Sequence, residues 1–103
     1  MAFKLIWSAT AREDLHEVVS FIAQDNRAVA ESFGYLLMSK VDLLPQFPEM
    51  GRVVPEFADS NLREIVFRSY RIIYRVDPSK QFIAIARVWH GARGVPDIPS
   101  GGF

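Results

Sequence analysis

Residues 62–90 alternate between apolar and polar positions in the manner of β-strands. β-Branched and aromatic residues are dense in this stretch, and Arg68-Ser69 and Pro78-Ser79 offer two tight turns that divide it. Arg71 and Arg75 recur at alternating positions of the middle segment. The pattern predicts three antiparallel strands with cationic side chains on one face, and such a face indicates an anionic partner or a chemical role.

The N-terminal part of the chain predicts a short strand followed by an amphipathic helix. Residues 3–7 alternate, and apolar residues over 11–22 then fall on one helical face. Ser8 or Thr10 is placed to cap this helix, and Thr10 with Glu13 matches a capping box.

A second helix follows with almost no connection. The first helix is expected to end near Asp25, and Asn26 can cap a second one, in which apolar residues recur every three or four positions until Pro45. A connection this short predicts an antiparallel helical hairpin, and its apolar stripes need a sheet to cover.

Residues 45–61 show no regular periodicity. They hold three prolines and a glycine over 17 residues, which predicts a long loop. Loops of that length in small domains usually serve a function, so Glu56, directly after Pro55, is a candidate chemical group.

The strands can be paired on the assumption that Pro78-Ser79 alone form the second turn. Asp77 then opposes Lys80, and Arg71 opposes Ala86. The face toward the helices would carry Ile65, Phe67, Tyr70, Ile72, Tyr74, Val76, Ile83, Ile85 and Trp89. The candidate working face would carry Leu62, Glu64, Val66, Arg71, Ile73, Arg75, Phe82, Ala84, Ala86, Val88 and His90. A slip of one residue would exchange the faces of one strand.

These elements predict one α+β domain, residues 1–93, of order β-α-α-β-β-β, with an antiparallel sheet covered on one face by the helical hairpin. The Gly- and Pro-rich tail, residues 94–103, is expected either to be disordered or to lie along the domain through apolar residues, namely Val95, Ile98 and Phe103.

Composition narrows the chemistry. The 103 residues include no cysteine and only two histidines, which excludes disulfides and thiolate chemistry and disfavours a zinc site; we expect no metal and no cofactor. No apolar run is long enough for a membrane span and the N-terminus lacks a signal-peptide pattern, so we expect a cytoplasmic protein without membrane contact.

The charge is unevenly distributed along the chain. The formal net charge is zero, which argues against strong non-specific binding to nucleic acid. However, residues 1–61 hold five Lys/Arg against nine Asp/Glu, whereas residues 62–93 hold seven against two. The predicted sheet is therefore the basic end of a polarised molecule.

The order of elements, together with the segments YRIIYRV (70–76) and VWHGAR (88–93) and the loop GRVVPE (51–56), resembles the RelE/ParE superfamily of bacterial type II toxin–antitoxin systems. The resemblance covers roughly residues 3–93. It implies that the chain is the toxin of such a system. A cognate antitoxin would neutralise this toxin in a hetero-oligomer by wrapping its own C-terminal segment around it.

The family divides in its targets. ParE-like members are described as poisons of DNA gyrase, whereas RelE-like and YoeB-like members cut messenger RNA on the ribosome without a cofactor. The HGAR ending, the near-neutral charge and the absence of lysine and tyrosine from residues 81–103 are more similar to the ParE branch. We therefore expect gyrase inhibition, which is not an enzyme activity. Alternatives are a metal-independent endoribonuclease and a non-toxic binding module that keeps only the fold.

The resemblance also implies site residues. In the endoribonuclease reading, Glu56 resembles the general base of the YoeB branch, Arg71 its strand arginine and His90 its terminal histidine. These groups suit cleavage at a 2′-hydroxyl, because a base, a cation for the phosphate and an acid are all that it needs. The candidate partner-binding residues are the basic side chains Arg63, Arg71, Arg75, Arg87, His90 and Arg93.

Overall fold

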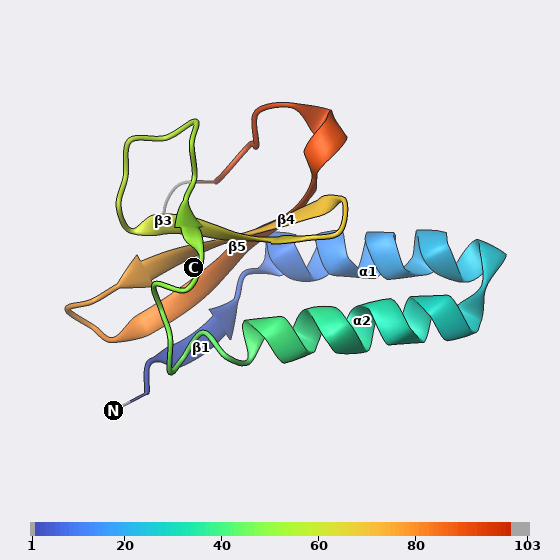
Figure 1. Ribbon diagram of the computed structural model, residues 1–103, viewed down its shortest axis with the longest axis horizontal. Helices are drawn as coiled ribbons and strands as arrows, with labels where there is room; N and C mark the ends of the chain where they lie inside the picture. The colour runs from blue at the N-terminus through green and yellow to red at the C-terminus, as the bar shows by residue number, and fades with distance from the viewer. Residues whose placement is uncertain (1, 100–103) are drawn as a thin grey trace.

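The computed structural model describes residues 2–99 as two layers, a helical hairpin and a five-stranded sheet (Figure 1). The helices are α1 (Ala9–Asp25) and α2 (Arg27–Val41), and a 3-10 helix, η1, spans Gly91–Arg93. The strands are β1 (Lys4–Trp7), β2 (Arg52–Val53), β3 (Leu62–Phe67), β4 (Tyr70–Asp77) and β5 (Phe82–His90). The predicted α+β class is confirmed, and the predicted order of elements is found with one short strand, β2, added before β3.

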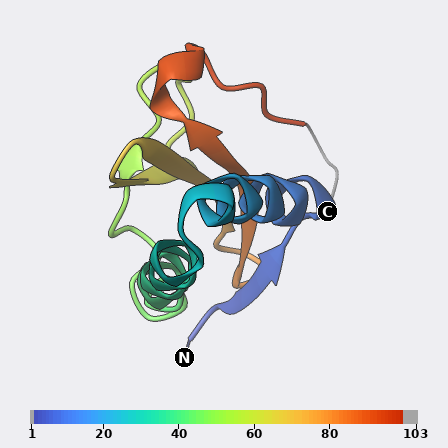
Figure 2. The same ribbon diagram turned by 90° about the vertical axis from the view of Figure 1, so that its right-hand side faces the viewer.

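The sheet is mixed, because its first strand joins in parallel. The strand order is β1-β5-β4-β3-β2; β1 runs parallel to β5, and the other neighbours are antiparallel. Figure 2 looks along the two helices, which lie on one side of the sheet. The return from α2 to the far edge of the sheet, through β2, places β1 and β2 at opposite edges.

Two short polar side chains set the helix boundaries. The Ser8 hydroxyl accepts from the backbone N–H of Ala11 at 3.0 Å and donates to the Ala86 carbonyl at 3.3 Å. The predicted Thr10–Glu13 capping box does not form, because the helix begins at Ala9 and Thr10 already lies inside it. Asn26 ends α1 and caps α2, as predicted, through a bond from the N–H of Val29.

The main core lies between the hairpin and the sheet. Its fully buried helical members come mostly from α2, including Phe33, Leu37 and Val41. Val29 and Leu36 share the predicted apolar stripe but are exposed, because they lie at its flank, beside the face of α2 that buries Ala30, Phe33, Leu37 and Val41. The hairpin extends beyond the end of the sheet (Figure 1). Neither helix described for residues 2–99 has the length and apolarity to cross a bilayer.

The two turns of the sheet differ from each other. Phe67 pairs with Tyr70, so the predicted Arg68-Ser69 turn is confirmed. The turn between β4 and β5 holds four residues, 78–81, because Asp77 pairs with Phe82. The predicted Asp77–Lys80 pairing is wrong: the Asp77 carboxylate instead accepts from the N–H of Lys80, at 3.0 Å, and so closes a longer turn.

A β-bulge in β5 changes which residues share a face. Tyr74 pairs with Ile85 and Ile73 with Arg87, so Ala86 has no opposite residue. One extra residue shifts every later side chain to the other face of the sheet.

Three face assignments are therefore wrong. Arg71 pairs with Trp89 rather than with Ala86. Trp89 packs on the face away from the helices, Val88 joins the main core, and His90 turns to the helix side, opposite Tyr70. The rest of the predicted core face, on β3, β4 and the start of β5, is as expected.

A second, smaller core covers the other face of the sheet. It contains Val54, Leu62, Ile73, Ala86 and Trp89, with Phe57 and Ile98 packed against it. Residues 45–61, predicted to be irregular, therefore include the short strand β2 and a fully buried valine. In the tail, Ile98 packs on this core and Val95 is exposed, while Phe103 lies outside the described residues.

Tyr74 fixes the path of the 45–61 segment. Its hydroxyl donates to the Pro48 carbonyl at 2.8 Å and accepts from the Gly51 N–H at 3.0 Å. A Cβ at Gly51 would lie 2.5 Å from the Glu64 carbonyl oxygen and 2.7 Å from the Tyr74 hydroxyl. Only glycine lets this segment approach the sheet so closely.

Gly51→Ala is expected to lower the free energy of unfolding by about 1–3 kcal/mol, because the added methyl group must displace backbone. Gly34→Ala is the matched control: its Cβ would lie 3.7 Å from a Val19 methyl group, inside α2, where alanine is favoured over glycine by about 1 kcal/mol. Urea denaturation of both variants measures the difference. Equal effects of the two substitutions would contradict the close approach at Gly51.

Candidate functional site

Four alternating charges meet on the sheet face away from the helices. We call them the Arg71 cluster; they are Arg52 on β2, Glu56 in the following loop, Glu64 on β3 and Arg71 on β4. Arg71 donates through Nε to Glu64 at 2.6 Å and through both Nη atoms to Glu56 at 2.8 and 2.6 Å. Arg52 donates to the other oxygen of Glu64 at 2.7 Å.

Glu64 is the buried centre of this cluster. Its side chain is 0 % exposed, whereas those of Arg71 and Arg52 are 12 % and 60 % exposed. A carboxylate removed from water needs counter-charges and hydrogen bonds, and two guanidinium groups supply both. The pairing of β2 with β3 places Arg52 directly opposite Glu64, so the strand register itself builds half of the cluster.

Glu56 covers the outward edge of Arg71. The fork-to-fork geometry is the strongest form of arginine–carboxylate pairing, and it lowers the pKa of Glu56 from 4.5 to about 2. The same hydrogen bonds raise the pKa of Arg71. All the nitrogens of this guanidinium thus face carboxylates of the chain itself.

This arrangement bears directly on acid–base chemistry. A general base works best when its pKa lies near the working pH, and a carboxylate with a pKa of about 2 is a very weak base at neutral pH. Both Glu56 oxygens are also engaged by Arg71. In this conformation the pair is an internal ion pair rather than a base beside a free phosphate-binding cation.

His90 does not join the Arg71 cluster. It lies on the opposite face of the sheet, where its ring packs edge-on against Tyr70 with centroids 5.0 Å apart. Its Nδ1 accepts from the Ala92 N–H at 3.0 Å and so caps η1. Of the three residues expected for an endoribonuclease, the structure brings Glu56 and Arg71 together and separates His90 from both.

Arg87 is part of the scaffold. It donates to Asp14 on α1 at 2.8 and 3.0 Å, and the same carboxylate accepts from the Val88 N–H at 3.0 Å. These bonds raise the pKa of Arg87. Asp14, which the sequence did not single out, lies 73 residues away in the chain, and no local signal predicts such a contact.

Trp89 lies between two cations. The guanidinium carbons of Arg87 and Arg93 are 4.8 and 3.9 Å from its ring centroid. The indole N–H donates to the Gly94 carbonyl at 3.2 Å, which ties the start of the tail to the sheet. Arg93 remains exposed, so of these two arginines only Arg93 is available to a partner.

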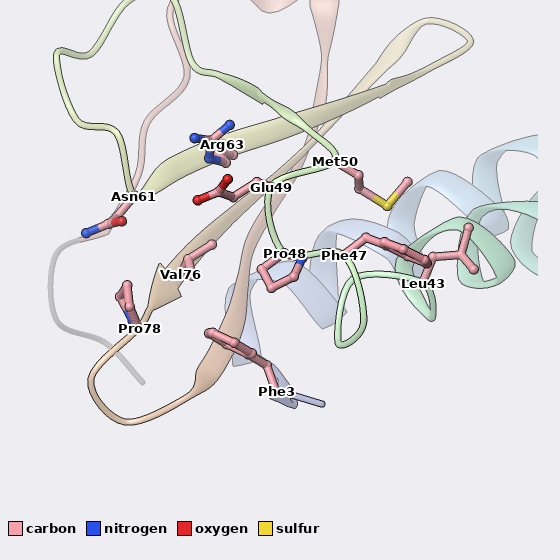
Figure 3. A pocket seen from close by; sticks show the side chains of 10 residues that line it. All are labelled: Phe3, Leu43, Phe47, Pro48, Glu49, Met50, Asn61, Arg63, Val76 and Pro78. Carbon is pink, nitrogen blue, oxygen red and sulfur yellow. The ribbon is translucent and has the colours of Figure 1, made fainter. Parts of the chain in front are cut away.

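The last two arginines lie apart from the cluster. Arg75 pairs with Asp59 at 3.2 Å on the half-exposed end of β4. Arg63 points to the helix side, donates to the Gly51 carbonyl at 2.9 Å and lines a groove of about 600 Å³. Figure 3 shows this groove, with Leu43 and Phe47 on one side and Asn61 and Pro78 on the other. Its walls are largely apolar.

The acidic residues of the site are not arranged as metal ligands. Within residues 2–99, no group of three His, Asp or Glu side chains is placed to hold a metal ion. The acidic side chains of the Arg71 cluster face arginines instead.

The comparison with known families decides the family of this chain. The model of the ParE toxin of the type II toxin–antitoxin system parDE matches residues 5–95. The chain belongs to this toxin family. The RelE/ParE resemblance expected from the sequence is confirmed.

Similar proteins come from both branches of the superfamily. Toxin RelE2 of Caulobacter vibrioides is 31 % identical over 91 residues, which cover 87 % of this ParE-family toxin and 97 % of the relative. The structure of a chromosomal ParDE system from P. aeruginosa aligns with a TM-score of 0.70 at 18 % identity, covering 86 % of this chain and 96 % of the other. The toxin RelE of E. coli, solved as a mutant in the free state, aligns with a TM-score of 0.61 at 20 % identity, covering 91 % and 88 %. These two structural likenesses concern the fold.

The Arg71 cluster should contribute strongly to the stability of this ParE-family toxin. Arg71→Ala leaves the buried Glu64 with only the largely exposed Arg52, and breaking a buried pair in this way costs about 3–5 kcal/mol. Arg75→Ala is the control, because an exposed pair such as Arg75–Asp59 contributes roughly 0–1 kcal/mol. Denaturant titration measures both, and similar losses would show that burial adds nothing to the Arg71 contacts.

The Glu56–Arg71 pair also predicts a pH dependence. Because folding lowers the pKa of Glu56 from 4.5 to about 2, its contribution to stability is complete above about pH 4.5 and is lost as the pH falls toward 2. The difference in unfolding free energy between the native chain and Glu56→Gln should therefore shrink over that range. Glu31→Gln, at an exposed position of α2, controls for the loss of one carboxylate. A difference that stays constant down to pH 2 would argue against the ion pair.

Proposed function

We propose that this ParE-family toxin acts in the cytoplasm by inhibiting DNA gyrase, and that a cognate antitoxin neutralises it. Gyrase is proposed as the target because the chain is more similar to the ParE branch of the superfamily. An antitoxin is proposed as the partner because the family belongs to type II toxin–antitoxin systems. It assigns no enzymatic reaction and no cofactor to the chain.

The observation that carries the proposal is that the three residues expected for a ribonuclease do not converge on one site. Arg71 is held by two carboxylates, Glu56 has a pKa of about 2, and His90 lies on the other face of the sheet. General acid–base cleavage needs a base, a cation and an acid converging on one phosphodiester. The geometry therefore favours a function that depends on a binding surface rather than on these three groups.

A specific observation favours the rival function, ribosome-dependent cleavage of messenger RNA. Glu56 and Arg71 are adjacent, and the relative with 31 % identity is named Toxin RelE2. For cleavage to occur, Glu56 would have to leave Arg71, regain a basic pKa and act with an acid other than His90. The gyrase proposal needs no such rearrangement.

Gyrase supercoiling and transcript cleavage, measured in parallel on the same purified toxin, test the two functions. We expect relaxed plasmid to stay relaxed as the toxin is added to gyrase, and primer extension in a translating extract to show intact transcripts. Glu56→Gln is expected to inhibit supercoiling as the native toxin does. Under the rival function, Glu56→Gln would reduce cleavage by about a hundredfold or more, the usual contribution of a general base.

Undiminished supercoiling at saturating toxin would overturn the gyrase assignment. Ribosome-dependent cleavage that is lost in Glu56→Gln would replace it with the endoribonuclease. Antitoxin binding without growth arrest on expression would instead identify a binding module that has kept only the fold.

The accessible basic groups are the proposed contacts for the target. Arg93 and Arg52 are exposed, and Arg63 faces the groove of Figure 3. Arg71 and Arg87 are engaged by carboxylates of the chain and contribute mainly to stability, whereas Arg75 makes only an exposed pair with Asp59. A partner with acidic segments suits this set, because guanidinium groups bind carboxylates in a fixed geometry.

A further inference from the structure

The groove of Figure 3 has apolar walls that the fold leaves open to solvent. It has a volume of about 600 Å³, and it lies between the segment that follows α2 and the adjoining ends of β3 and β4. Three of its large apolar side chains, Leu43, Phe47 and Met50, are 46, 56 and 45 % exposed. Large apolar side chains gathered around one open groove are typical of a binding site.

The groove is polar at one end and apolar at the other. Arg63 and Asn61 lie at the end formed by β3 and the residues before it, whereas Leu43 and Phe47 lie at the end formed by the segment after α2 (Figure 3). Groups arranged in this way suit a ligand that has one polar head and an apolar body.

The charged group that suits such a head is Arg63. Its side chain is half-buried, and one of its Nη atoms donates to the Gly51 carbonyl at 2.9 Å. Within residues 2–99, no carboxylate forms a salt bridge with it. A partly desolvated guanidinium without a counter-charge gains from binding a carboxylate, which it holds through paired hydrogen bonds. The acidic lining residue Glu49 is exposed, so water weakens its repulsion of an anionic ligand.

We propose that this groove binds a medium-chain fatty acid, whose carboxylate pairs with Arg63 and whose alkyl chain lies against Phe47 and Leu43. A peptide is a poorer ligand, because each of its backbone N–H and C=O groups needs a hydrogen-bond partner and apolar walls offer none. The inference goes beyond the proposed function and does not depend on gyrase as the target.

The groove is connected to the Arg71 cluster through the backbone. Arg63 and Glu64 are consecutive on β3 and therefore point to opposite faces of the sheet. The wall formed by residues 47–50 leads into β2, where Arg52 pairs with Glu64 and Val53 pairs with Arg63. A ligand that holds this wall in place would also stabilise the pairing of β2 with β3. It would at the same time withdraw Arg63 from the surface that is offered to a target.

Nuclear magnetic resonance titration of the full-length toxin with octanoate, hexanoate and octylamine tests the inference. Octanoate should give saturable shifts of the amides of Phe47, Gly51 and Arg63. It should bind about tenfold more tightly than hexanoate, because each buried methylene contributes roughly fourfold. Octylamine has the same chain length and the opposite charge, and it should bind at least about tenfold more weakly than octanoate. Equal binding of the acid and the amine, or no saturable shift at millimolar octanoate, would overturn the inference.

Variants of the charged groups give a second readout. Arg63→Gln should weaken octanoate binding by about tenfold or more, because it removes a charge-assisted hydrogen bond. Glu49→Gln removes an anion from the same groove and should leave the affinity unchanged or raise it. Arg27→Gln, at an exposed position at the start of α2, controls for the loss of one arginine. Equal affinities of Arg63→Gln and Arg27→Gln would overturn the inference. If Arg63→Gln fails to fold, judged by circular dichroism, Phe47→Ala decides, and an affinity equal to that of the native toxin would overturn it.

Stability and oligomeric state distinguish a fatty acid from other occupants. At ten times its Kd, octanoate should raise the ratio of folded to unfolded toxin about elevenfold in a urea titration. A toxin that gives no such shift but forms a dimer, which Phe47→Ala abolishes, would show that a second copy occupies the groove. Antitoxin protection of the amides of residues 47–51 that octanoate does not reverse would assign the groove to the antitoxin. Either result would overturn the inference and leave the gyrase proposal standing.

Discussion

The burial of one carboxylate organises the half of the molecule that carries the candidate site. Glu64 is removed from water on the sheet face away from the helices, and it is stabilised only while Arg71 and Arg52 neutralise it. Arg71 lies on the neighbouring strand β4, whereas Arg52 lies on β2, in the segment that leads from α2 back to the sheet. The close approach at Gly51 and the Tyr74 hydrogen bonds hold this segment against the sheet, so that Arg52 reaches Glu64. The loop that holds Glu56 is placed as a result.

The same constraint decides how the basic residues are used. A sheet rich in arginine suggests a surface for anions, yet a guanidinium that is both engaged by carboxylates and buried in the fold is not accessible to a partner. Arg71 and Arg87 hold the sheet to its own loop and to α1 through buried contacts. Arg93 and Arg52 keep much of their surface in solvent. The positive balance of residues 62–93 therefore overstates the charge that the folded surface offers.

Much of the candidate site followed from the sequence, and the reasons for the remainder are specific. Glu64 and Arg71 were expected on one face because β3 and β4 meet at a two-residue turn, which fixes their register. Strand pairing could not place Glu56, because it lies in a loop. It was expected near Arg71 only because the family resemblance assigns both residues to one site. Asp14 and Arg52 were missed as partners. Their contacts join segments that only the packing of α1 on the sheet and the pairing of β2 bring together.

The sequence by itself determined the family and every helix and strand except the short β2 and the 3-10 helix. Helical periodicity, the Asn26 cap and alternating strands are local properties, and they specify a hairpin that covers a sheet. The tertiary structure alone decided the faces of β5. Its four-residue turn preserves the predicted faces at the start of the strand, and the bulge at Ala86 exchanges them for Val88, Trp89 and His90. The bulge depends on hydrogen bonds that β5 makes to segments outside its neighbouring strand β4. The Ser8 hydroxyl donates to the Ala86 carbonyl, and the Asp14 carboxylate accepts from the Arg87 side chain and the Val88 N–H. No local pattern in the sequence encodes these contacts, so only the assembled fold separates His90 from Arg71.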